Sequence, residues 1–293
     1  MTSWERGDPE VAVGGFGAAL DTFQAGPHSP FILGNAARVA EVLASAEADR
    51  GDEAALRITL ARRSAFLGEL WQPSADPSQD EVALRQCNDD ALHAVLAVTS
   101  NDIVGASQLA EAGIARVTAV HFKRPDSNEE NDCRSILWWA LGKAQYSAGD
   151  AVGAQETLRR SIKANELAKD GSAVNLRRVG NVSTWLALAQ IRQGHLVEAR
   201  ATLAPVLALH RSLTKLSTES AQQRLEMAAA WYAQALAEPT QAGRRRLLKD
   251  ASGLLDGLPA AMHGLRSFQL WRGWISSARS GNDAWPPKDA GHD

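Results

Sequence analysis

The chain has 293 residues, of which 45% are hydrophobic and 22% charged, and its formal net charge is −3. This composition is typical of a folded chain, and the small negative charge argues against a dominant role in binding nucleic acid or an anionic membrane surface. The two cysteines, Cys87 and Cys133, have no metal-ligand spacing around them and fall on different predicted helices, so we expect no disulfide framework.

Short polar turns recur along the chain, each between two long stretches with helical apolar periodicity. They are Gly51-Asp52, Asn101-Asp102, Gly149-Asp150, Gly194-His195 and Glu238-Pro239, and the interval between them shrinks from 50 to 44 residues. That interval is the length of two helices of about 18 to 20 residues plus two loops. A helical hairpin cannot bury its apolar face alone, so the pattern predicts stacked hairpins in an all-α solenoid with a concave surface.

In chain order, the first helix is expected to begin after Asp8, with Pro9 at its first position, and to run toward Gln24. Hairpins are expected at about 30–72, 80–122, 132–169, 172–214 and 217–256, and a closing helix at 259–280 is expected to cap the open end of the stack. Pro205 falls inside the last helix of the fourth hairpin and predicts a kink or a split there. Residues 1–280 then form a single helical-repeat domain, followed by a flexible tail at 281–293.

No apolar stretch approaches the 18 residues or so that a membrane-spanning helix needs, and the first residues show no basic segment followed by an apolar run. We therefore expect a cytoplasmic protein without a membrane partner.

A more specific pattern lies at 138–162. It consists of Trp138, Leu141-Gly142, Gly149-Asp150, Ala154, Leu158 and Ile162, and it resembles the tetratricopeptide repeat (TPR). The next repeat keeps a weaker version, with Trp185, Leu186, Gly194, Ala199 and Leu203, and Ala187 in place of the glycine. The resemblance implies a right-handed helical-hairpin solenoid whose concave groove binds peptides. The repeats of about 44 to 50 residues are longer than the usual TPR length of about 34 residues. In repeat length they are similar to the helical sensor and peptide-receptor regions of bacterial regulators.

The TPR register implies a set of groove-facing residues. They are Trp139, Lys143 and Tyr146 in the best repeat, and Asn181, Thr184, Leu188 and Arg192 in the next. Two cations, an amide and two aromatic rings suit a peptide carboxylate or an acidic segment, with the asparagine holding the extended peptide backbone. The alternative is that Lys143 and Arg192 are solvated.

Trp139, Trp185 and Trp231 recur at one-repeat spacing on the first helices of successive hairpins. Because a buried tryptophan covers a large apolar area, they are interpreted mainly as core between repeats. Trp139 or Tyr232 is the candidate for lining the groove.

Two kinds of charged cluster are candidates for chemical sites. Asp89-Asp90 with His93 is similar to the aspartate-rich metal motif of all-α terpene synthases, but no second motif with the required spacing follows, so a pair between Asp89 and His93 is the better interpretation. Arg177-Arg178, like the arginines at 244–246, lacks a nucleic-acid-binding motif around it and is interpreted as a solvated helix face.

The predicted function is a protein- or peptide-binding scaffold acting as adaptor, chaperone or sensor, with no cofactor, no metal, no catalytic residue and no nucleic-acid partner. One alternative is a regulator that senses a small molecule or peptide. A further alternative is an all-α enzyme with a pocket walled by tryptophans. Its walls would be Trp138, Trp139 and Trp185, and its polar groups Asp89, Asp90 and His93. The lack of any recognisable catalytic pattern favours a non-enzymatic role.

Overall fold

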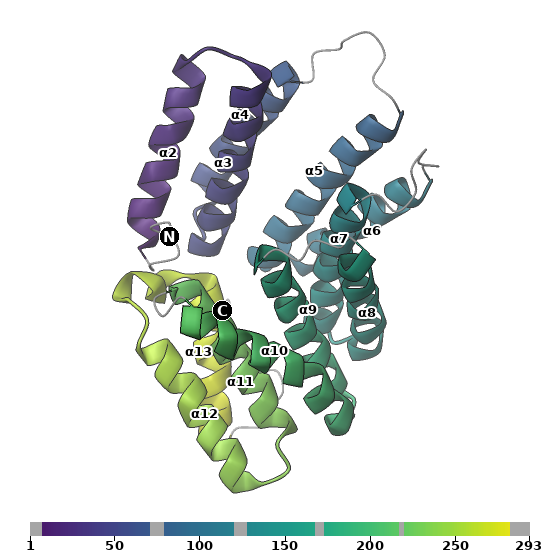
Figure 1. The fold of residues 1–293 in the computed structure, drawn as a ribbon, viewed down its shortest axis with the longest axis vertical. Coiled ribbons are helices and arrows are strands. Elements are labelled where there is room, and N and C mark those ends of the chain that lie inside the picture. Colours follow the sequence, from purple (N-terminus) through teal and green to yellow (C-terminus); the bar gives the residue numbers. More distant parts are fainter. Residues whose placement is uncertain (1–7, 71–78, 120–127, 168–172, 217–219, 282–293) are drawn as a thin grey trace.

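The structure is a computed structural model that describes residues 8–70, 79–119, 128–167, 173–216 and 220–281. These residues form twelve α-helices, one short 3-10 helix and no β-strand (Figure 1). The α-helices are α2 (Pro9–Ala25), α3 (Pro30–Arg50), α4 (Glu53–Leu70), α5 (Gln79–Thr99), α6 (Ile103–Ala119), α7 (Asn128–Ala148), α8 (Ala151–Leu167), α9 (Ala173–Arg192), α10 (Leu196–Leu216), α11 (Ala221–Ala237), α12 (Gln241–Asp256) and α13 (Arg266–Arg279). The 3-10 helix η1 (Ala260–Gly264) precedes α13.

Neighbouring helices pack in succession, and the helix pairs α3–α4, α5–α6, α7–α8, α9–α10 and α11–α12 each form a hairpin. The first helices of adjacent hairpins are also in contact: α5 contacts α7, and α9 contacts α11. The colours of Figure 1 follow this order through the array, from purple α2 to yellow α13. The predicted all-α, solenoid-like fold is therefore confirmed.

The predicted turns have a shared backbone chemistry. Four of them place one residue in the left-handed region, namely Gly51, Asn101, Gly149 and Gly194, with φ of 75°, 63°, 97° and 80°. After Gly51, the Asp52 amide donates to the Glu47 carbonyl (2.9 Å), and the Asp52 carboxylate accepts from the Ala55 amide (3.1 Å). The turn thus satisfies the end of one helix and the start of the next, which explains its recurrence in the sequence.

The Leu-Gly pair of the TPR-like pattern marks the closest approach of α7 and α8. A Cβ atom added at Gly142 would lie 2.6 Å from Cγ of Leu158, so only glycine fits without movement of the neighbouring helix. In the next repeat the equivalent Ala187 is fully buried, which shows that α9 tolerates a methyl group at this position.

The helix α10 runs from Leu196 to Leu216 as one helix that contains Pro205, so the predicted split does not occur. Buried Leu203 and Val206 on either side of the proline anchor this helix in the core. That packing offsets the backbone hydrogen bond that the proline cannot make.

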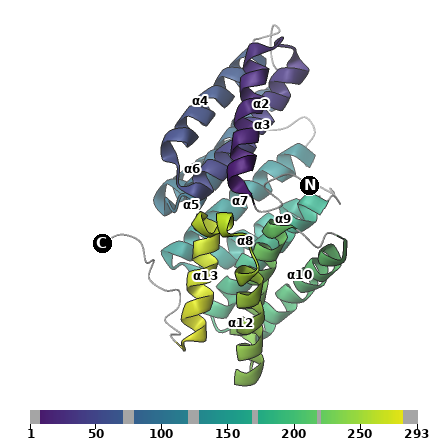
Figure 2. The same cartoon turned by 90° about the vertical axis from the view of Figure 1, so that its left-hand side faces the viewer.

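The sequence suggested that the last helix caps an open end of the stack, but the structure places it differently. It packs on α11 and α12, and its first turn reaches back to α3 (Figure 2). The Ser267 amide and hydroxyl donate to the two carboxylate oxygens of Asp49, each at 2.7 Å, and Arg266 donates to the Ala48 carbonyl at 3.4 Å. Residues 218 positions apart therefore close the array on itself. Apart from Gly281, the predicted tail lies outside the described residues.

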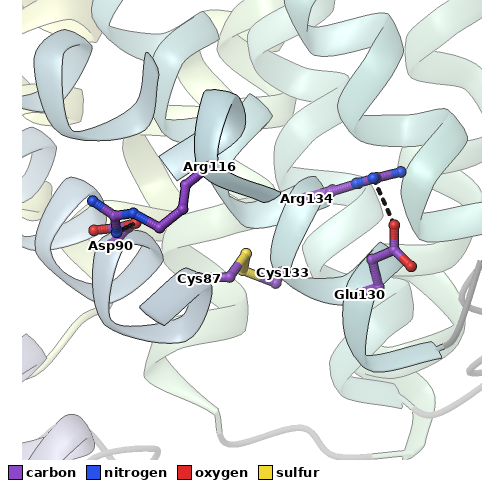
Figure 3. Close-up of a disulfide and its surroundings, with 6 residues drawn as sticks. All are labelled: Cys87, Asp90, Arg116, Glu130, Cys133 and Arg134. Carbon is purple, nitrogen blue, oxygen red and sulfur yellow. Dashed lines mark hydrogen bonds and ion pairs between the residues drawn. A yellow bond between two sulfur atoms is a disulfide. The ribbon is translucent and has the colours of Figure 1, made fainter. Parts of the chain in front are cut away.

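Cys87 on α5 and Cys133 on α7 form a disulfide, contrary to our expectation (Figure 3). Their separation of 46 residues is about one repeat, and the first helices of adjacent hairpins are in contact. Cysteines on different helices can therefore meet when they occupy equivalent positions in successive repeats. The ion pairs Asp90–Arg116 and Glu130–Arg134 lie beside this disulfide.

None of the helices in the described ranges combines the length and the apolar character that crossing a membrane requires.

Candidate functional site

A cavity of about 1050 Å³ lies where α3, α5, α7, α9, α11 and α13 converge. Its lining includes six of the seven residues that the TPR register predicts for the groove: Trp139, Lys143, Tyr146, Asn181, Thr184 and Arg192. Leu188, which the same register also placed in the groove, is instead fully buried in the core. The TPR register thus selected residues of α7 and α9 that lie on one wall of one cavity.

Lys143 is the central charged group of this wall. Its ammonium lies 5.5 Å from the ring centroid of Trp139 and 5.1 Å from that of Trp185. The surrounding protein lowers the pKa of Lys143 to about 8, because burial penalises the charged form and the negative charge of Asp49 only partly offsets this. The side chain keeps part of its surface open to the cavity, so it is not a solvated surface lysine.

The remaining predicted polar residues are held by neighbours. The Trp139 indole donates to the side-chain oxygen of Asn181 at 3.0 Å, and Thr184 donates to the Gly180 carbonyl at 2.9 Å. Arg192 donates to the Tyr146 carbonyl at 3.0 Å, and its guanidinium lies 5.7 Å from the Tyr146 ring. Arg192 is therefore fixed in place and not a freely solvated side chain.

Helices α3 and α13 contribute residues that the sequence reasoning missed. From α3 comes Asp49, whose carboxyl pKa is raised by burial despite the hydrogen bonds from Ser267. From α13 come Arg266, Trp271 and Trp274. The spacing of Phe268, Trp271, Trp274 and Ile275 gives α13 an apolar face, which is the signal that could have placed this helix against the concave side.

The tryptophans of α13 complete an aromatic cluster. Trp271 lies 5.4 Å from Trp185 and 5.3 Å from Trp274, measured between ring centroids. Tyr146 is fully buried against Trp185, at 5.5 Å. Tyr232 packs against both tryptophans of α13 and is not among the lining residues, so of the two aromatic candidates only Trp139 lines the cavity.

The charges around the cavity do not balance. Lys143, Arg192 and Arg266 are the lining cations, and Asp49 and Glu226 are the lining acids. The carboxylate of Glu226 accepts hydrogen bonds from Nε and Nη2 of Arg177, at 3.1 and 2.8 Å, so its charge is already neutralised. The lining therefore has a positive excess, which favours an anionic ligand.

One further ionisable residue, His210, lines the cavity and is buried. Burial lowers the pKa of His210 below its ordinary value, so this side chain is neutral at pH 7 and does not alter the balance.

The acidic cluster on α5 is not part of this site. Asp89 pairs with Arg63 at 2.5 Å and Asp90 with Arg116, so the predicted pair of Asp89 with His93 is wrong. Arginines from neighbouring helices compete better for these carboxylates than a histidine one turn away. Within the described ranges, no group of three or more histidine, cysteine, aspartate and glutamate residues is placed to hold a metal ion.

The tryptophan-walled pocket of the enzyme alternative is also not formed by the residues that the sequence suggested. Trp138 lies under the guanidinium of Arg160 at 5.1 Å and is not a lining residue of the cavity, and neither are the acidic residues of α5. Arg177 and Arg178 are also not simply solvated, because they pair with Glu226 and Asp132 on neighbouring helices.

Comparison of the chain with models of protein families, with curated proteins and with solved structures found no match.

Proposed function

We propose that this chain is a TPR-type peptide-binding protein and that a short acidic segment, or the terminal carboxylate of a peptide, occupies the cavity. The observation that carries the proposal is the convergence of Lys143, Arg192 and Arg266 on one aromatic-walled cavity with a positive excess. Charge-assisted hydrogen bonds from such groups are the strongest that a carboxylate can accept.

The same wall offers contacts for the rest of a peptide. The side-chain oxygen of Asn181 accepts from Trp139, and the two N–H donors of the same side-chain amide can bind a ligand carbonyl. The half-buried indole ring of Trp139 offers apolar surface to side chains of the peptide, and Trp271 and Trp274, buried in the core behind it, add a small apolar area. Asparagine, cations and indoles together match an extended peptide with at least one acidic group.

The dimensions of the site favour a segment over a folded partner. A volume of about 1050 Å³ is at the upper end for small-ligand pockets, which typically span about 300–1,000 Å³. Because α13 closes the array against α3, a folded domain cannot lie in this cavity, whereas a few extended residues can. An adaptor, chaperone or sensor role would then operate through a short segment of the partner.

The cytoplasmic location stays a prediction, and the disulfide argues against it. Glutathione and thioredoxin keep most cytosolic thiols reduced, whereas the disulfide of Cys87 and Cys133 would persist in an oxidising compartment.

Selection from a library of random dodecapeptides tests the peptide proposal. We expect the wild-type protein to enrich acidic peptides, or peptides that need a free C-terminus, and Lys143→Gln/Arg192→Gln to bind them at least about tenfold more weakly. The matched control is Lys163→Gln/Arg211→Gln, which removes the same charges from exposed positions outside the cavity. If the wild type enriches no peptide, or both double variants bind equally, the proposal is wrong.

A second candidate is a receptor for a small molecule, and the observation that favours it is that α13, whose first turn is hydrogen-bonded to α3, bounds one side of the cavity. Titration of tryptophan fluorescence with a set of aromatic carboxylates would distinguish the two, because a small-molecule receptor binds them in the absence of any peptide.

A further inference from the structure

We propose that the Nζ amine of Lys143 acts as a nucleophile toward aldehydes or ketones held in the cavity, and that the preferred carbonyl compounds also carry an anionic group. The activity goes beyond peptide binding. It uses the same cavity but does not depend on a peptide occupant.

The first support is the position of the amine. Lys143 lines the cavity, and its terminal nitrogen lies over the rings of Trp139 and Trp185. No carboxylate among the described residues lies within ion-pair distance of this nitrogen, and no described residue is its hydrogen-bond partner. A lysine that lines the cavity, keeps part of its surface exposed and has its amine beside two indole rings is available to a compound that enters the cavity.

The second support is the protonation of this amine. The ionisable groups that line the same cavity are Asp49 on α3, Tyr146 on α7 itself, Arg192 on α9, His210 on α10, Glu226 on α11 and Arg266 on α13. With a pKa of about 8, roughly one-tenth of the Lys143 amine is neutral at pH 7, against about one part in 3,000 for an ordinary lysine. The population of the nucleophilic form is therefore raised about 300-fold.

The reaction needs no oxidant or reductant. The lone pair of the neutral amine attacks the carbonyl carbon and forms a C–N bond, while the carbonyl oxygen takes up a proton and becomes the hydroxyl of a carbinolamine. The C–O bond then breaks, the oxygen leaves as water, and the nitrogen lone pair completes a C=N bond. Amine and carbonyl compound give imine and water, and addition of water reverses the reaction.

The third support is the chemistry of the surrounding wall, which sets the preferred compound. Arg192 and Arg266 present guanidinium groups to the cavity, so a carboxylate on the carbonyl compound gains charge-assisted contacts. The half-buried indole of Trp139 offers apolar surface to a flat body, whereas Trp271 and Trp274 are buried in the core and add only a small apolar area. An aromatic aldehyde with a carboxylate combines the features that this lining selects.

The test uses 4-carboxybenzaldehyde, with 4-(hydroxymethyl)benzaldehyde as a neutral compound of similar size. Each is incubated with the folded protein and sodium cyanoborohydride, which reduces the imine to a stable amine, and peptide mass mapping then measures the modified fraction of each lysine. A weaker base is also a weaker nucleophile, so we expect Lys143 to react about tenfold or more faster than exposed Lys163 at pH 7, not the full population ratio.

Three further readouts make the result specific to the folded cavity. The rate at Lys143 should level off above about pH 8 while the rate at Lys163 keeps rising. The carboxylated aldehyde should react faster at Lys143 than the neutral one, and the advantage of Lys143 should vanish in concentrated urea. Reaction of Lys143 no faster than Lys163 in the folded protein overturns the proposal. Enrichment of peptides without selective labelling refutes this inference alone, and selective labelling without peptide enrichment refutes the proposed function alone.

Discussion

Replacing Lys143 by methionine is expected to stabilise the folded protein at pH 7. Methionine keeps the length and the apolar stem of the side chain but removes the ammonium from its position among the cavity walls. The lowering of the Lys143 pKa from 10.5 to about 8 corresponds to about 3 kcal/mol of differential stability between the two protonation states. Removing the cation also takes from buried Asp49 the larger of the two positive charges that compensate it, so we expect a net gain of about 1–2 kcal/mol.

The sign can be checked through pH. Because the amine binds its proton less tightly in the folded state, the unfolded state carries more protons between pH 8 and 10.5. The wild-type protein therefore gains stability as the pH rises through this interval, and the Lys143→Met variant does not. The advantage of the variant should be full below pH 8 and should shrink toward pH 10.5.

Urea denaturation of both proteins at pH 7 and pH 10, followed by circular dichroism at 222 nm, measures the difference, with Lys163→Met as the exposed control. A variant that is less stable than the wild type at pH 7, or a difference that does not change with pH, would refute the reasoning that the Lys143 ammonium destabilises the fold.

Three other predictions concern the scaffold. Reducing the disulfide between Cys87 and Cys133 should lower the free energy of unfolding by about 2–4 kcal/mol, the range expected for a loop of 46 residues. Urea midpoints with and without reductant measure this difference, and equal midpoints would contradict the presence of the disulfide. Gly142→Ala should lower the stability of the folded protein by about 1–3 kcal/mol, because the added methyl group collides with α8. The control Gly273→Ala, in open space on α13, should be neutral or stabilising by up to about 1 kcal/mol. Equal melting temperatures of the two variants would contradict the close approach of α7 and α8. Burial raises the pKa of Asp49, so the contribution of Asp49 to stability is largest below the unfolded pKa near 3.8 and is lost as the pH rises through the folded pKa. Urea midpoints should therefore show a greater disadvantage of Asp49→Asn relative to the wild type at pH 4 than at pH 7. The opposite trend would contradict the raised pKa.

Features determined by neighbouring residues could be predicted from the sequence. The turns at Gly51, Asn101, Gly149 and Gly194 follow from left-handed residues and from the polar residues after them, and both signals are local. Trp139, Lys143 and Arg192 fall on one cavity wall because helical periodicity, once in register, places them on one face.

Features that depend on how far the array bends could not be predicted in this way. The apolar face of α13 is visible in the sequence, but its neighbours depend on the summed angles between all the hairpins before it. For the same reason Asp49 and Arg266 belong to one site although they lie 217 positions apart in the sequence, and no local pattern links them. The disulfide depends on contact between the first helices of adjacent hairpins, because Cys87 and Cys133 lie 46 residues apart, about one repeat, on α5 and α7.

The contact of Ser267 with Asp49 gives this array a fixed number of units. In an open solenoid, a repeat can be inserted or deleted and the remaining repeats keep their neighbours. Here an added hairpin would carry the first turn of α13 about one helix-pair width away from α3, beyond the reach of two hydrogen bonds of 2.7 Å. The geometry of every hairpin is thus constrained by the requirement that the whole series returns to its starting point, as in a closed ring.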